Sequence, residues 1–151
     1  MKHRKSSPIT LAVAAAALAG CSTLPELRTP LSGSTWRLVE MQSSDDAQGT
    51  TQPGNRDRYT IKFNADGSAY LQLDCNRGRT GWEASRTGAS SGTLTFKPLA
   101  STRALCQDNG LGERLAQQLE YVRSYVIRDG QLNMSLYADG GILVWERTGQ
   151  N

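Results

Sequence analysis

Three cysteines and one histidine are the residues of this 151-residue chain with the most distinctive side-chain chemistry. A cysteine thiol can form a disulfide, bind a metal ion or act as a nucleophile, and a histidine can act as a general base. Cys21 and His3 stand close to the N-terminus, whereas Cys75 and Cys106 stand far inside the chain. The chemistry open to each residue therefore depends on the segment that contains it.

The first 20 residues have the layout of an export signal. A basic start is followed by a largely apolar run from Ile9 to Ala19 and then by small residues. Crossing a bilayer takes about 20 apolar residues, so this run is too short for a transmembrane helix. A basic start, a short apolar run and small residues are typical of a secretory signal peptide. We therefore expect residues 1–20 to be removed.

The string Leu18-Ala19-Gly20-Cys21 resembles the lipobox of bacterial lipoproteins. The resemblance implies cleavage before Cys21 and lipid attachment to it, with residues 21–33 as a tether. Ser22 follows in place of an Asp, which implies sorting to the outer membrane, with the protein on its periplasmic face and the lipid as its membrane contact. The alternative is an ordinary signal peptide in which Cys21 stands near the end by chance.

Removal of the signal changes the charge and the catalytic options. Lys2, Arg4 and Lys5 leave with it, so the mature chain is close to neutral and has no electrostatic footprint for nucleic acid. His3 leaves too, and without it neither a Ser-His-Asp triad nor a His-ligated metal site can form. We therefore expect no enzyme activity, no metal and no cofactor.

Cys75 and Cys106 then remain together in an oxidising compartment. A disulfide between them would close a loop of about 30 residues and stabilise the fold by about 3–4 kcal/mol. The alternative is two buried thiols that never meet, because sequence does not show their separation. Two cysteines without a cluster of His or carboxylates make a poor zinc site.

Other polar and aromatic residues have weaker signals. Three neighbouring residues are candidates for contact with an anion or a partner: Asn76, Arg77 and Arg79. A solvated hairpin loop explains the two arginines as well. The three tryptophans could line a ligand pocket, but in a small barrel such aromatic residues usually form the core; they are Trp36, Trp82 and Trp145.

Alternation of apolar and polar residues predicts short strands along the rest of the chain. The expected strands are 35–41, 59–63, 69–73, 81–86, 94–96, 124–128, 132–136 and 142–146. The polar stretch 43–58 predicts a long exposed loop. An apolar stripe at helical spacing predicts one helix, formed by Leu111, Leu115, Leu119 and Val122.

This order of elements predicts a mostly β fold: a small antiparallel, partly open β-barrel with a single α-helix packed at one end or seam. The expected domain covers residues 34–148.

Four strings in this region, in the same order and at similar spacing, resemble the META domain, or HslJ-like, family of bacterial lipoproteins. They are Gly33-Ser34-Thr35-Trp36, Phe63-Asn64-Ala65-Asp66-Gly67, Cys75-Asn76 and Thr102-Arg103-Ala104-Leu105-Cys106. The resemblance implies a small antiparallel barrel with a helix and a role in heat or antibiotic tolerance at the envelope. Asp74 departs from the pattern, because a Gly is common before Cys-Asn. The backbone there is therefore expected to differ.

These observations favour a non-enzymatic envelope lipoprotein that binds another envelope component, such as an envelope protein. A carrier of a small apolar ligand, with an open barrel interior lined by the tryptophans, is the alternative. An enzyme that uses Asp74, Arg77 and Arg79 is a third hypothesis.

Overall fold

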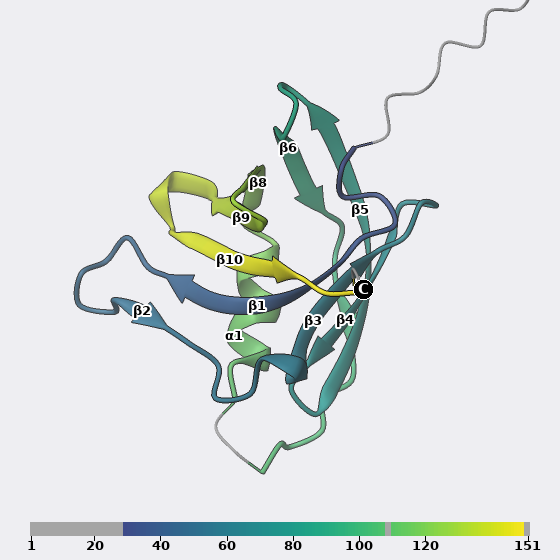
Figure 1. Cartoon of the computed structure of the whole chain (residues 1–151). Helices are drawn as coiled ribbons and strands as arrows, with labels where there is room; N and C mark the ends of the chain where they lie inside the picture. The colour runs from purple at the N-terminus through teal and green to yellow at the C-terminus, as the bar shows by residue number, and fades with distance from the viewer. Residues whose placement is uncertain (1–28, 108–109, 150–151) are drawn as a thin grey trace, which may run out of the picture.

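The computed structural model describes residues 29–107 and 110–149, and it is mostly β-sheet with one α-helix (Figure 1). The signal, Cys21 and most of the expected tether lie outside these residues. In chain order the strands are β1 (Thr35–Gln42), β2 (Thr50–Thr51), β3 (Tyr59–Phe63), β4 (Ser68–Leu73), β5 (Asn76–Arg86), β6 (Ser91–Phe96), β7 (Ala100–Ser101), β8 (Val122–Arg128), β9 (Gln131–Leu136) and β10 (Ile142–Arg147). The α-helix is α1 (Gly112–Leu119), and two short 3-10 helices are η1 (Arg56–Arg58) and η2 (Tyr137–Asp139).

Eight antiparallel strands close into a barrel. Their order is β10-β9-β8-β6-β5-β4-β3-β1, and β1 pairs with β10 to complete the ring, for example through Leu38 opposite Trp145. The short β2 pairs with the end of β1, and the short β7 pairs with β5. The expected mostly β barrel with one helix is confirmed, and the β1–β10 pairing closes it more fully than expected.

Alternation along the strands fills the barrel. In β3 the side chains of Tyr59, Ile61 and Phe63 are buried, and β9 repeats this pattern in its own inward positions. Period-2 alternation places one set of side chains in the core and the other in solvent. The β3–β4 turn follows its sequence, because Gly67 takes a φ of 81° and the Asp66 carboxylate accepts the Ser68 N–H.

Two sequence expectations about single elements were wrong. Residues 43–58 do not form a plain exposed loop: β2 pairs with β1, the Arg114 guanidinium of α1 donates to the Thr51 hydroxyl, and η1 follows. Val122 does not extend the helix but begins β8, although it is fully buried as an apolar stripe requires.

Arg77 and Arg79 lie within β5 and not in a hairpin loop. The strand alternates as expected, with Gly78 and Thr80 buried between exposed neighbours, but neither is an apolar signal. A Cβ at Gly78 would lie 2.9 Å from a methyl carbon of Leu99, so a larger residue there would have to displace the end of that side chain. The observed strand begins at Asn76, whereas the sequence predicted a start at position 81.

The barrel has two different ends. At the N-terminal end, where β1 begins, Leu31 is fully buried in the core and Gly33 donates to the Phe63 carbonyl. At the opposite, helical end, α1 packs against β4 with Leu115 and Leu119 buried. In Figure 1, residues 29–34 lie away from α1. The chain thus enters the barrel opposite its helix.

Candidate functional site

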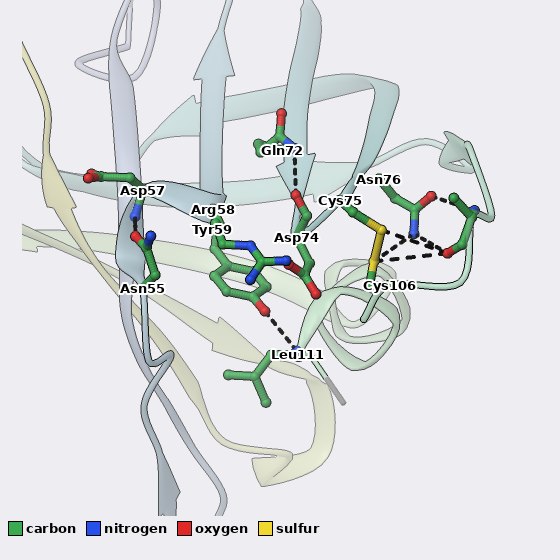
Figure 2. A network of polar contacts seen from close by, with 11 residues as sticks. Asn55, Asp57, Arg58, Tyr59, Gln72, Asp74, Cys75, Asn76, Cys106 and Leu111 are labelled. Atoms are coloured by element: carbon green, nitrogen blue, oxygen red, sulfur yellow. Dashed lines mark hydrogen bonds and ion pairs between the residues drawn. A yellow bond between two sulfur atoms is a disulfide. The ribbon is translucent and has the colours of Figure 1, made fainter. Parts of the chain in front are cut away.

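A disulfide joins Cys75 and Cys106 at the helical end of the barrel, with a Cα–Cα distance of 5.6 Å (Figure 2). It connects the residue before β5 to the segment that follows β7. The expected pairing of these two cysteines is confirmed. Its structural effect is to fix residues 102–106 beside the start of β5.

Asn76 holds the same segment by a second device. Its side-chain amide donates to the Ala104 carbonyl at 3.0 Å and accepts the Ala104 N–H at 2.7 Å. The Thr102 hydroxyl also donates to the Asn76 side chain, at 2.9 Å, and accepts the Arg77 N–H at 3.0 Å. The Asn76 amide therefore pairs with Ala104 much as a neighbouring strand would. The pattern Cys-Asn with a later Thr-x-x-x-Cys thus holds residues 102–106 in place, and these residues are called the locked segment below.

Asp74 forms the turn between β4 and β5. Its φ of 64° lies in the left-handed region, so the backbone has the conformation that a Gly favours even though the residue is Asp. Its carboxylate is buried and forms an ion pair with Arg58 (Figure 2). The Gln72 side-chain amide donates to the Asp74 carbonyl at 2.6 Å. The expected backbone difference is therefore not seen in the φ of Asp74, which a Gly would also adopt, and the Asp in place of Gly adds a buried ion pair.

The approach to α1 is packed closely against this turn. The Leu111 N–H donates to the Tyr59 hydroxyl at 3.0 Å, as Figure 2 shows. A Cβ at Gly110 would lie 2.0 Å from a carboxylate oxygen of Asp74, and one at Gly112 would lie 2.6 Å from the Leu73 carbonyl. Sequence analysis missed the parts played by Arg58, Tyr59 and the two glycines, because these contacts join residues far apart in the chain.

A cleft of about 370 Å³ lies between the locked segment and the helix. One side consists of residues 101–105, and α1 with the residue after it contributes Glu113, Ala116, Gln117 and Glu120. Leu73, Leu99 and Asn76 add to its lining. Among the candidate contact residues, Asn76 thus borders the cleft, but its amide already bonds within the protein.

Arg77 and Arg79 do not line this cleft. Both are exposed, on the outer side of β5, and the Arg79 guanidinium lies over the Tyr70 ring at 5.4 Å from its centroid. Contact of these two residues with an anion or a partner stays a prediction.

The tryptophans belong to the core. Trp36 and Trp145 are almost completely buried, Trp82 is 9% exposed, and none of them lines the cleft. Nearby on β8, the hydroxyl of buried Tyr125 has no hydrogen-bond partner among the described residues, and burial raises the pKa of this phenol. These aromatic rings account for the packing of the barrel interior.

Titratable groups elsewhere have structural explanations. Hydrogen bonds from Ser68 lower the pKa of Asp66 in its turn, and amide donors from Gln42 and Gln52 lower the pKa of Glu40. Within residues 29–107 and 110–149, no group of three or more His, Cys, Asp or Glu side chains is placed to hold a metal ion. In the same part of the chain, no helix has the length and apolar character that crossing a membrane requires.

Comparison with known proteins gave one family match. A family model described as the META domain matches residues 29–149. A search of curated proteins found no match.

Solved structures share the fold. An NMR structure of a protein from Burkholderia xenovorans is 19% identical over 97% of this chain and 99% of its own, with a TM-score of 0.63. The crystal structure of a duf4847 family protein from Bacteroides vulgatus is 14% identical over 81% of this chain and 97% of its own, with a TM-score of 0.55. At such identities the likeness establishes the fold alone.

Proposed function

The chain belongs to the META domain family, and we propose that it is an outer-membrane lipoprotein that binds another envelope component at the helical end of its barrel. The lipid on Cys21 would anchor it, and the folded domain would face the periplasm. Binding would support envelope integrity under heat or antibiotic stress.

The observation that carries this proposal is the position of the cleft relative to residues 29–34, through which the chain enters the barrel. The chain reaches the barrel through buried Leu31 at the N-terminal end, whereas the disulfide, Asn76 and the cleft lie at the helical end. An anchor at Cys21 would therefore leave the helical end free to meet a partner. A disulfide at that end suits an oxidising compartment.

A binding role also agrees with how the polar groups at this end are used. The side chains of Asn76, Asp74 and Tyr59 each bond or pair with another part of the protein, so they build a rigid surface. A carrier of an apolar ligand needs an open interior lined by tryptophans, and the tryptophans are packed in the core instead.

The anchor is tested by replacing Cys21. The wild-type chain and Cys21→Ser are produced in the native bacterium, and intact mass and survival under heat and antibiotic stress are measured. We expect a lipid-bearing wild-type protein cut before Cys21, and an unlipidated variant that restores survival poorly. An unlipidated wild-type protein, or a variant that localises and functions like the wild type, would contradict the proposal.

A further inference from the structure

The barrel is closed, but the pairing between β6 and β8 covers only part of β6. β6 pairs with β8 through Ser91, Gly92 and Thr93, which lie opposite Val126, Tyr125 and Ser124. In the described part of the chain, the remainder of β6 and all of β7 have no strand partner on that side. The cleft lies elsewhere, between α1 and the segment that starts at Ser101 in β7.

The segment after β7 presents an unpaired backbone edge at the cleft. The Thr102 N–H donates to the Arg77 carbonyl, and the Ala104 N–H and carbonyl pair with the Asn76 side chain, so these groups point toward β5. Residues 102–106 lie beyond the end of β7, yet Thr102 and Ala104 bond toward β5 as alternate residues of a strand do, so the residues between and after them face away from β5. The backbone groups of Arg103 and Leu105 have no hydrogen-bond partner among the described residues, and the Leu105 side chain is 99% exposed.

The edge is held rigidly in place. The disulfide fixes its far end at Cys106, the β5–β7 pairing fixes its near end at Ser101, and Asn76 fixes the middle. A strand edge that is ordered before binding loses little conformational entropy when a peptide pairs with it. Exposed, unpaired edges are the surfaces to which extended peptides add as a further strand.

The helix side of the cleft bears acidic side chains. Glu113 and Glu120 are exposed and line it, and the basic residue of α1, Arg114, bonds to Thr51 outside the cleft. The basic residue of the lining, Arg103, belongs to the other side, in the segment after β7. Leu73, Leu99 and Ala116 add apolar surface to the lining of the same cleft. An occupant would therefore place a basic side chain against the helix and apolar side chains toward the barrel.

We propose that this cleft binds an extended polypeptide segment with at least one Lys or Arg, which adds as a strand to the edge of residues 103–105. The inference rests on the proposed function, because it names the chemical class of the envelope component. The partner would be a protein with an exposed or unfolded basic segment, and the contact would combine backbone hydrogen bonds with ion pairs to the helix.

Peptide selection tests this proposal. A phage library of random dodecapeptides is panned against the full chain purified from membranes in detergent, and the strongest peptide is synthesised. We expect selected sequences rich in Lys or Arg. The double variant Glu113→Gln with Glu120→Gln is expected to weaken binding about tenfold, whereas the control Glu83→Gln, outside the cleft, changes it less than about twofold.

Backbone methylation of the peptide tests strand addition itself. Alternate N–H groups of an added strand face the edge, so N-methylation at one alternating set abolishes binding and at the other set leaves it unchanged. No enrichment over an unrelated bait, equal loss or equal tolerance for both methylated sets, or no effect of the double variant would overturn the inference. Thermal unfolding of the variants, expected to be unchanged, confirms that they fold.

The two proposals fail separately. If Cys21→Ser abolishes function while no peptide is selected, the anchored binding protein stands and the peptide inference falls. If peptides bind as described but the wild-type protein carries no lipid, the peptide inference stands and the anchored lipoprotein falls.

Discussion

At the scale of single residues, the polar side chains at the helical end act mainly on one another. The Asn76 amide replaces a missing strand, and Asp74 holds a left-handed turn while its carboxylate pairs with Arg58. Motif spacing in the sequence was sufficient to bring Asn76 and the two cysteines together. It was insufficient for Arg58 and Tyr59, because ordinary residues on a strand and a turn give no local signal of a partner across the barrel.

Tyr125 gives a prediction at this scale. Its buried hydroxyl has no partner among the described residues, so Tyr125→Phe should stabilise the domain by about 1 kcal/mol in urea unfolding near pH 8. The control is Tyr59→Phe, which removes the acceptor of the Leu111 N–H and should destabilise by about 1 kcal/mol. Equal effects of the two substitutions would show that the Tyr125 hydroxyl is satisfied.

The same residue sets a pH dependence. Burial raises the pKa of Tyr125 above its ordinary value of 10.0, so below that pH the phenol is neutral in both the folded and the unfolded chain. As pH rises beyond it, the unfolded chain ionises first, which stabilises the unfolded state and lowers the free energy of unfolding. The urea midpoint of the wild-type chain should therefore fall between pH 8 and about pH 11, and it should fall less in Tyr125→Phe. An identical alkaline loss in the variant would assign the effect elsewhere.

At the scale of elements, hydrophobic alternation predicted nearly every long strand, because each strand has one face in the core and one in solvent. The failures share a cause: a tertiary contact decided the local structure. Gly78 and Thr80 continue β5 inward without apolar side chains, and β2 forms because β1 supplies a partner and Arg114 bonds to Thr51. The cleft is likewise decided by tertiary contacts, because it lies between α1 and the segment that Asn76 and the disulfide hold, and alternation does not specify these contacts.

The disulfide is the element-scale prediction. The cysteines are 31 positions apart, so replacing both by Ser should destabilise by about 3–4 kcal/mol on the loop-entropy model. The wild-type chain under reducing conditions should unfold at the same urea concentration as the double variant. The barrel should still fold, since Asn76 and β7 keep their bonds to the segment. An unchanged midpoint in the variant would mean that the bridge contributes no stability.

At the scale of the whole molecule, the two ends of the barrel differ in structure. The N-terminal end receives the chain through Leu31, and the helical end bears the disulfide and the cleft. The sequence indicated an anchor at Cys21 and a single domain after it. It could not indicate that buried Leu31 and the cleft lie at opposite ends, because that depends on the path of eight strands around the ring.

Photocrosslinking in intact cells tests the binding role most directly. A photoreactive amino acid is placed at Gln117 in the cleft or, as a control, at exposed Asp129 in the β8–β9 turn. We predict a discrete crosslinked protein from position 117, which is absent from position 129 and much reduced when Cys21 is also replaced by Ser. Identical products from both positions, or no product from position 117, would contradict a partner at the helical end.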